Sequence, residues 1–175
     1  MASRSSCRHS KRRVSDRAPT FRLVSCDPDG RPDDPVGELP KAIAEACIAC
    51  SDLYKRITFR PPWVSYIALD ANLAVGLGAF VGPPVEDQVE ISYFTLPEHA
   101  GHGLATLTAR SLVVLAQESQ PKVKIFAKTA PEANASTAIL TKLGFKRVGT
   151  TIDHEIGEAW AWLLDGPPRA LPRME

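Results

Sequence analysis

The segment from Pro97 to Thr106 restricts the possible folds of this chain more than any other part of its sequence. It reads Pro-Glu-His-Ala-Gly-His-Gly-Leu-Ala-Thr, and it joins alternating apolar residues at Val89 to Thr95 to residues of helical apolar spacing at Leu104 to Glu118. Glycine lets the backbone approach a ligand closely, and the unpaired N–H groups at a helix start attract anions. The pattern therefore predicts a strand, a turn and a helix, with the turn placed to bind a diphosphate.

The Gly-x-Gly of this segment is compatible with more than one kind of turn. A tight turn capped by glycine accounts for it without any ligand. A Walker A loop requires Gly-Lys-Ser/Thr, which is missing here. A Rossmann turn expects a third small residue and an acid about 20 residues further on, where this chain has Lys122 and Lys124. The glycine-capped turn and the diphosphate site, with the Thr106 hydroxyl as an extra donor, both stay open.

The rest of the sequence indicates one α/β domain. A length of 175 residues fits a single core. Strands are expected at residues 20–25, 63–69, 73–81, 89–95, 123–127, 146–151 and 159–164, and helices at 39–50, 52–57, 104–118 and 131–143. This order predicts a hairpin-rich antiparallel half followed by one strand–helix–strand unit. We place the domain at residues 20–165, between a basic disordered arm (1–19) and a loose tail (166–175).

The charge distribution sets the arm apart from the domain. Six basic residues and one acid precede residue 20, which leaves 15 basic and 19 acidic residues in the remainder. The arm is rich in serine and poor in large apolar residues, so we expect it to be disordered; contact with nucleic acid is the less favoured interpretation. No run of about 18 apolar residues occurs, so no membrane span is expected.

Cys47 and Cys50 form a C-x-x-C on a predicted helix, and no second pair has the spacing of a zinc site. We interpret them as structural thiols and expect no metal. Nothing in the cysteine pattern demands an oxidising compartment, so a cytoplasmic location is expected.

A second segment, from Thr129 to Phe145, gives the first one a context. It contains a helix start at Pro131 and an expected helix end at Gly144. Together the two segments make the chain resemble the GNAT superfamily of acetyl-CoA-dependent N-acetyltransferases, most closely the branch that includes the ribosomal-protein N-terminal acetyltransferases. The resemblance covers roughly residues 60–164 and implies a mixed, mostly antiparallel central sheet flanked by helices.

Three ordered motifs account for this resemblance. Residues 89–93, Val-Glu-Ile-Ser-Tyr, match a Val-Glu-Ile-Gly-Tyr strand, and residues 97–106 match a Pro-x-x-Arg/Gln-Gly-x-Gly-Tyr-Ala-Thr turn. Residues 131–145 match a Pro-Glu-Asn-x-x-Ser helix start that ends in Lys-x-Gly-Phe. Two positions depart from the pattern: Ala100 replaces a long polar side chain, and Ala133 replaces an asparagine that is displaced here to Asn134. Backbone N–H donors survive both changes.

The resemblance implies direct attack of an amine on the thioester of acetyl-CoA. No covalent enzyme nucleophile is needed, and the chain has no Gly-x-Ser-x-Gly elbow. The acceptor is expected to be a small-molecule or peptide amine, and the protein a monomer or a homodimer. The alternative is a non-catalytic acyl-CoA-binding or regulatory module of the same fold.

Site residues follow from the resemblance as expectations. Glu90 is the candidate base and Ser136 the candidate proton donor to the leaving thiolate; a surface carboxylate and a plain helix-start serine are their alternatives. A backbone N–H near Phe94 or Thr95 would stabilise the oxyanion, and His102 stands where relatives often carry Arg or Lys. The implied coenzyme-binding residues are Phe94, Thr95, Leu96, Gly101, His102, Gly103, Leu104, Ala105, Thr106, Asn134, Ser136 and Lys142.

Overall fold

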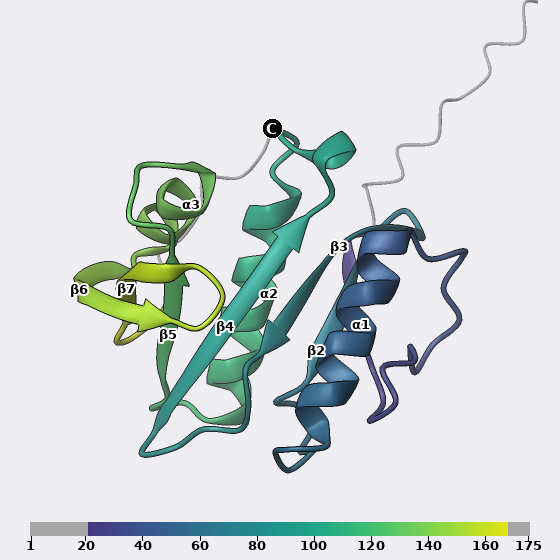
Figure 1. Cartoon of the computed structure of the whole chain (residues 1–175), viewed down its shortest axis with the longest axis horizontal. Coiled ribbons are helices and arrows are strands. Elements are labelled where there is room, and N and C mark those ends of the chain that lie inside the picture. The colour runs from purple at the N-terminus through teal and green to yellow at the C-terminus, as the bar shows by residue number, and fades with distance from the viewer. Residues whose placement is uncertain (1–20, 168–175) are drawn as a thin grey trace, which may run out of the picture.

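The computed structural model describes residues 21–167 (Figure 1). The arm at residues 1–19 and most of the expected tail, residues 168–175, lie outside the described residues. No helix in the described part of the chain is long and apolar enough to cross a membrane.

One seven-stranded sheet with the order β1-β2-β3-β4-β5-β7-β6 forms the centre of the molecule. Its strands are β1 (Arg22–Ser25), β2 (Ser65–Asp70), β3 (Leu73–Phe80), β4 (Gln88–Thr95), β5 (Lys124–Thr129), β6 (Lys146–Asp153) and β7 (Gly157–Leu164). Only the β4–β5 pair is parallel, and the other neighbours are antiparallel. The expected α/β class with a mixed, mostly antiparallel sheet is confirmed.

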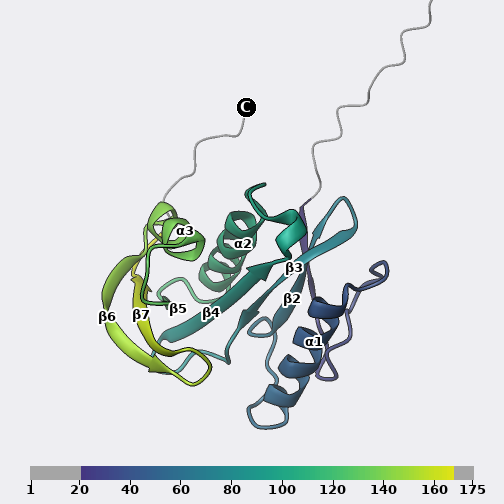
Figure 2. The same ribbon diagram turned by 45° about the horizontal axis from the view of Figure 1, so that its top comes forward.

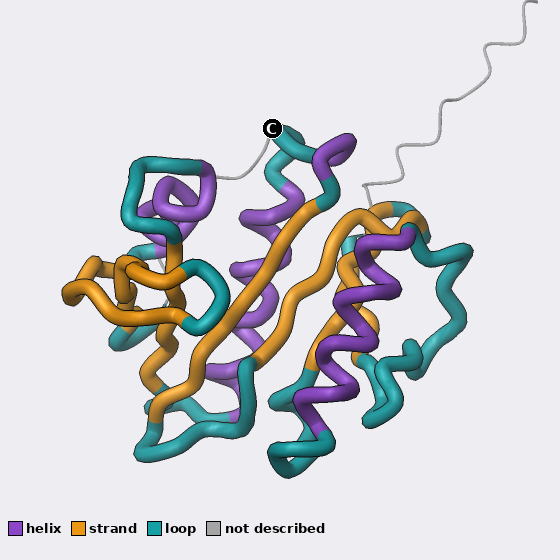
Figure 3. The backbone as a smooth tube through the Cα atoms, viewed as in Figure 1, coloured by secondary structure: helices purple, strands orange, loops and turns teal. Residues whose placement is uncertain are grey.

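Helices cover the two faces of the sheet unequally. Helix α1 (Lys41–Tyr54) packs on β2 and β3, while α2 (Leu104–Ser119) and α3 (Ala135–Leu143) lie on the opposite face (Figures 1 and 2). The buried residues accordingly form one large cluster between the sheet and α2–α3 and a smaller one beneath α1. In Figure 3 the strands β4 to β6 carry no helix on the α1 side.

The prediction of a separate helix at 52–57 is wrong. Helix α1 continues without a break to Tyr54, because neither proline nor glycine interrupts residues 41–54. The Tyr54 hydroxyl also fixes the last turn, since it donates to Ser65 Oγ at 3.1 Å and accepts from the Ser65 N–H at 2.6 Å.

A close approach between β3 and α2 positions the predicted turn. A Cβ atom at Gly78 would lie 2.8 Å from Thr108 Cγ2 and 3.0 Å from Leu112 Cδ1. Glycine at this position therefore lets α2 pack directly on the sheet behind β4. As a result the start of α2 stands at the end of β4, as the sequence predicted.

Helix α3 starts later than predicted. The expected first turn at Pro131 is wrong, because Asn134 is the residue that precedes the helix, in an extended conformation (φ −149°). The Asn134 side chain accepts the Thr137 N–H at 3.0 Å, and Thr137 Oγ1 accepts the Asn134 N–H at 3.0 Å. This reciprocal capping box satisfies two N–H donors at the observed helix start. The helix ends at Gly144 (φ +97°), as expected.

Candidate active site

The strands β4 and β5 pair only at one end and then diverge. Gln88, Val89 and Glu90 pair with residues 124–126 of β5, and no later β4 residue pairs with β5. Figure 1 shows β4 separating from β5 towards its carboxyl end. The space between the two strands where this pairing is missing, here called the opening, therefore begins at Glu90 on the β4 side.

The edge of β4 that faces this opening has unpaired backbone groups. On the other edge, the Leu96 N–H donates to the Val75 carbonyl at 2.9 Å, and the β3–β4 register is continuous from Gly76–Thr95 to Phe80–Ile91. Because hydrogen-bonded pairs alternate in an antiparallel ladder, the backbone of Phe94 is also directed at β3. The N–H groups of Tyr93 and Thr95 face the opening instead.

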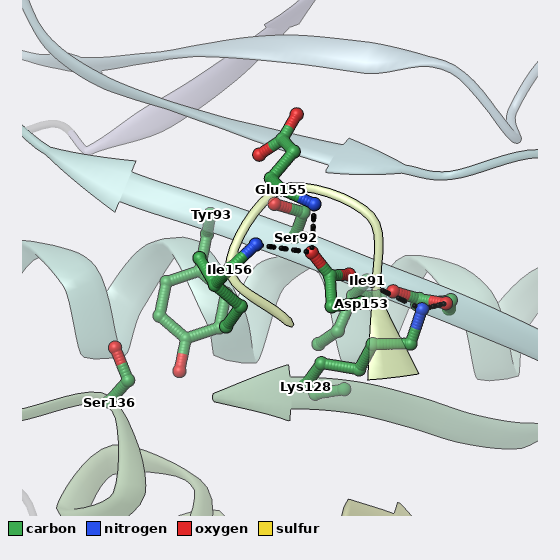
Figure 4. Close-up of a pocket in the computed structure, with 10 residues that line it drawn as sticks. Ile91, Ser92, Tyr93, Lys128, Ser136, Asp153, Glu155 and Ile156 are labelled. Atoms are coloured by element: carbon green, nitrogen blue, oxygen red, sulfur yellow. Dashed lines mark hydrogen bonds and ion pairs between the residues drawn. The ribbon is translucent and has the colours of Figure 1, made fainter. Parts of the chain in front are cut away.

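A pocket of about 180 Å³ occupies the narrow end of the opening. It is lined by four consecutive residues of β4, two of β5, one of α3 and three from the β6–β7 hairpin. These are Glu90, Ile91, Ser92, Tyr93, Ala127, Lys128, Ser136, Asp153, Glu155 and Ile156 (Figure 4). The structure thus brings both predicted catalytic residues, Glu90 and Ser136, to one pocket.

Lys128 connects the carboxylates of this pocket. Its ammonium lies 3.2 Å from Glu90 Oε2 and 3.5 Å from Asp153 Oδ2. Partial burial favours the neutral amine, but the hydrogen bond and charge of Glu90, together with Asp153, outweigh it and raise the pKa of Lys128. The lysine therefore stays charged near neutral pH and holds the Glu90 carboxylate at the edge of the pocket.

Asp153 orders the hairpin tip that closes the pocket on one side. Its Oδ1 accepts the Glu155 N–H at 2.9 Å and the Ile156 N–H at 3.3 Å. The Glu155 N–H is the main cause of the lowered pKa of Asp153, and Lys128 contributes to it. The side chain that fixes the turn is thus tied to the side chain that holds Glu90.

Two buried hydroxyls on β4 have no hydrogen-bond partner. Within residues 21–167, Tyr93 Oη and Thr95 Oγ1 are the buried side-chain oxygens or nitrogens in this condition. Burial raises the pKa of the Tyr93 phenol. An unsatisfied buried hydroxyl costs about 1–3 kcal/mol, so two of them on one strand, two residues apart, indicate a place for a polar ligand.

The predicted diphosphate turn has the conformation that its glycines suggested. Gly101 and Gly103 adopt φ values of +81° and +77°, and a Cβ on either would meet no atom within 4 Å. Gly103 precedes α2 and no side chain caps this helix. The first intrahelical donor is the Leu107 N–H, which bonds to the Gly103 carbonyl at 3.0 Å. The N–H groups of residues 104–106 are therefore available to an anion.

The polar side chains around this turn reach solvent. His102 is exposed, with Nδ1 3.4 Å from the His99 carbonyl oxygen, and Thr106 is half-buried. Leu104 is buried and Ala105 is half-buried, so they offer the turn backbone groups only.

Several predicted coenzyme residues lie away from the opening. The side chains of Phe94 and Leu96 pack in the cluster beneath α1, on the opposite face of the sheet from α2. Asn134 and Lys142 line a separate groove beside Trp160, and the Asn134 side chain is engaged in the capping box. These four residues are not gathered with the turn and the pocket.

The sequence did not reveal the place of Lys128 and Asp153 in the site or the missing partner of the Tyr93 hydroxyl. Lys128 did leave a signal, since it is a charged residue directly after the strand that was expected at residues 123–127 and interpreted as buried. Asp153 left none, because it reaches the site only through the hairpin. Within the described residues, no group of three or more His, Cys, Asp or Glu side chains is arranged to hold a metal.

Comparisons with known proteins agree with this geometry. The family model of the acetyltransferase (GNAT) domain matches residues 12–146. A comparison with curated protein sequences gives no match. Many solved structures match, and three of them illustrate the similarity.

A spermidine N-acetyltransferase chimera of Vibrio cholerae SpeG and hSSAT gives a TM-score of 0.60 at 15% identity, over 83% of this chain and 95% of that one. RimL, a ribosomal L7/L12 α-N-protein acetyltransferase in complex with coenzyme A, gives 0.57 at 14% identity, over 72% of each chain. YncA, a putative acetyltransferase from Salmonella typhimurium with acetyl-CoA, gives 0.54 at 17% identity, over 75% of this chain and 78% of that one. The chain spans 65% of the length of two further acetyltransferase structures that it matches. At these identities the structural similarity concerns the fold.

Proposed function

Because this chain belongs to the GNAT acetyltransferase family, we propose that it is an N-acetyltransferase that transfers the acetyl group of acetyl-CoA to a primary amine. The acceptor is a small-molecule or peptide amine. Glu90 is the proposed base, and the N–H groups around Gly103 are the proposed diphosphate site.

The observation that carries the proposal is the continuity of β4 between these two places. Glu90 lies where β4 leaves β5, and the strand then leads through Tyr93 and Thr95 to the turn at Gly101–Gly103. Coenzyme A combines a diphosphate with an extended arm that contains two amides and ends in sulfur. An extended strand edge with unpaired N–H groups suits such an arm, and the start of α2 suits the diphosphate.

The orphaned hydroxyls fit the same ligand. The oxygens of Tyr93 and Thr95 are buried in the structure without a partner, and the amide and sulfur groups in the arm of coenzyme A would be suitable partners. Gly101 and Gly103 leave open space where side chains would stand, so the backbone is accessible to phosphate. The residues present therefore fit the cosubstrate, although Ala100 adds no polar side chain to the turn.

The proposed reaction requires a neutral amine. An alkylammonium titrates near 10, so the acceptor must lose a proton before it attacks the thioester carbonyl. Glu90, directly or through water, accepts that proton. The C–N bond then forms, and the C–S bond breaks with its electron pair leaving on sulfur. The nitrogen's second proton goes to the thiolate, and amide and coenzyme A are released.

Two features of the pocket support Glu90 as the base. It is half-buried at the narrow end of the opening, and its carboxylate is fixed by Lys128 at 3.2 Å. Ser136 lines the same pocket from the first turn of α3, and its proposed role is to pass the nitrogen's second proton on to the leaving sulfur.

Thiol release from acetyl-CoA in the presence of an amine panel tests the proposal. Glu90→Gln is expected to lower kcat by about 100-fold or more, which is the usual contribution of a general base. The affinity for acetyl-CoA, measured by calorimetry, should stay within about threefold because the carboxylate does not contact the diphosphate or the arm. Glu158→Gln is the matched control, since Glu158 is an exposed carboxylate on β7 outside the pocket.

Unchanged turnover in Glu90→Gln would exclude Glu90 as the base. The absence of acetyl-CoA binding in the unmodified protein would contradict the proposal as a whole. Binding without turnover on a broad panel would favour the second candidate, a non-catalytic acyl-CoA-binding module. That candidate is motivated by Ala100 and Ala133, and the displaced Asn134 is engaged through its side chain in the capping box.

A further inference from the structure

The three tyrosines of this chain are hydrogen-bonded in different ways. Tyr54 exchanges hydrogen bonds with Ser65, and the Tyr66 hydroxyl donates to the Pro62 carbonyl at 2.6 Å. The Tyr93 hydroxyl is buried and has no partner within the described residues. Folding thus provides partners for two of the phenols and leaves the third without one.

The orphaned hydroxyl lies at the candidate site. Tyr93 lines the pocket together with Glu90 and Ser136. Figure 4 shows its ring extending from β4 with the hydroxyl directed towards the start of α3, where Ser136 lies. Because Tyr93 is three residues beyond Glu90 on β4, its ring stands on the face that carries α2 and Glu90 on the other.

This arrangement places the proposed base, Glu90, and the Tyr93 phenol on opposite faces of β4. The base faces the side of β4 that carries no helix, and the phenol faces the helix side, where the turn at the start of α2 would hold the coenzyme. If an acyl group lay between these two side chains, the amine would approach it from the Glu90 side, and its sulfur would lie near Tyr93.

We propose that the Tyr93 hydroxyl is a catalytic hydrogen-bond donor to the thioester sulfur, which stabilises the thiolate as the C–S bond breaks. This inference rests on the proposed acetyl transfer. The electron pair of the C–S bond leaves on sulfur, and Tyr93 donates a hydrogen bond to it without giving up its proton. The proton that finally neutralises the thiolate comes from the nitrogen, which becomes acidic as the C–N bond forms.

The acidities favour donation without transfer. A thiol titrates near 8.5 and a phenol near 10, and burial raises the pKa of Tyr93 further. The phenol therefore stays protonated wherever the thiolate exists, and it can act as a fixed donor at the charge that develops on sulfur. Ser136 is half-buried and open to water, so its hydroxyl is a less constrained donor.

The experiment compares Tyr93→Phe with Tyr66→Phe. Removing the Tyr93 hydroxyl takes away an unsatisfied polar atom, so the melting temperature should be unchanged or higher. At the same time kcat should fall at least about tenfold, with the KM for acetyl-CoA within about threefold, because the bond strengthens as charge develops on sulfur. Tyr66→Phe removes an existing hydrogen bond outside the pocket, so the melting temperature of this variant should fall while its kcat stays unchanged.

A binding measurement isolates the sulfur contact from turnover. The unmodified protein should bind coenzyme A more tightly than desulfo-coenzyme A, in which hydrogen replaces the thiol. Tyr93→Phe should bring the two affinities within about twofold of each other, and Ser136→Ala should leave the difference in place.

The outcomes separate this inference from the proposed function. If coenzyme A binds and the preference for the thiol persists in Tyr93→Phe, the inference is overturned while the acetyltransferase assignment stands. Loss of the preference in Ser136→Ala instead would assign the donor to Ser136 and overturn it as well. If the unmodified protein binds neither ligand, the proposed function fails first and the role of Tyr93 with it.

Discussion

Asp153 performs two tasks that a single carboxylate side chain can combine. One oxygen accepts the N–H groups of Glu155 and Ile156, and the other lies 3.5 Å from the Lys128 ammonium. The side chain is only 15% exposed, so these contacts are partly shielded from water. Through Lys128 the hairpin tip and Glu90 share one charge network, which makes the pocket sensitive to the protonation of a residue outside the chemistry.

The lowered pKa of Asp153 predicts how this residue affects stability. The Glu155 N–H and Lys128 favour the carboxylate in the folded protein, so the stabilisation is complete above the unfolded pKa of about 3.9 and is lost as pH falls through the lower folded value. Asp153→Ala should lower the melting temperature by about 2–4 °C at pH 6, as expected for about 1 kcal/mol in a chain of this size. The difference from the unmodified protein should close as pH drops below about 4.

Thermal unfolding followed by circular dichroism from pH 6 to pH 3 measures this difference. Asp52→Ala is the control, because the pKa of Asp52 is also lowered by a lysine, Lys55, but this pair lies on the exposed surface and contributes little. If the difference in melting temperature between Asp153→Ala and the unmodified protein were as large at pH 3 as at pH 6, the role assigned to Asp153 would be contradicted.

Among the elements, the junction of β4 and α2 depends on backbone conformation more than on side chains. Gly103 precedes the helix with φ +77° and no side chain caps the first turn. An anion would therefore be bound by N–H groups whose direction the glycine sets. The same φ of +77° occurs at Gly157, next to the β6–β7 turn, and a Cβ would meet nothing within 4 Å at either position.

This coincidence gives a matched pair of variants. Gly103→Ala and Gly157→Ala should each cost about 1 kcal/mol of stability, because alanine is disfavoured in the left-handed region. Only Gly103→Ala should weaken acetyl-CoA binding, by about tenfold or more, since it redirects N–H donors that would bond a charged phosphate. Calorimetry on both variants measures the affinities. Equal affinities in the two variants would show that the turn is a helix cap without a ligand.

In the molecule as a whole, the sheet consists of two halves, β1 to β4 and β5 to β7, which are joined by a short stretch of β4–β5 pairing. Three residues of β4 pair with three of β5, and beyond Glu90 the halves separate (Figure 2). The large core beneath α2 and α3 contains residues from both halves, so packing holds them together where the backbone pairing does not. A ligand in the opening would complete a pairing that the chain itself leaves unfinished.

The short β4–β5 pairing predicts that amide exchange alternates between fast and slow residues along β4. In the free protein, the N–H groups of Tyr93 and Thr95 should exchange faster than those of Phe94 and Leu96, which are bonded to β3. Coenzyme A should slow the first pair and leave the second nearly unchanged. At about 100 times its Kd it should also stabilise the fold by about 2.7 kcal/mol. Hydrogen exchange resolved by NMR measures the pattern, and uniform protection along β4 would argue against binding at its open edge.

Much of the fold could be predicted from the sequence because most elements have local signals. The β2–β3 hairpin follows from two largely apolar runs that flank the turn residues Ala71 and Asn72, both of which adopt positive φ. The two wrong boundaries arose where local signals compete. Residues 50–54 contain no helix breaker, so α1 continues, and Asn134 forms a better cap than Pro131 because its side chain accepts an N–H.

The candidate site was predicted only in part, for a related reason. Glu90, Ser136 and the Gly101–Gly103 turn lie in motifs that can be read along the chain. Lys128 and Asp153 join Glu90 from β5 and from the end of β6, and no spacing in the sequence connects them. Phe94 and Leu96 were expected to bind the coenzyme, but their side chains pack beneath α1 and their N–H groups are directed at β3.

Periodicity and glycine conformation are local properties, so the amino-acid order was enough to establish a strand, a Gly-x-Gly turn and a helix at residues 89–118. Which other residues surround this strand–turn–helix unit depends on the tertiary structure. The divergence of β4 from β5, the ion pairs of Lys128 and the missing partner of the Tyr93 hydroxyl all involve segments distant along the chain. They are set by how the two halves of the sheet pack around one core, and that packing makes a Gly-x-Gly turn part of a candidate active site.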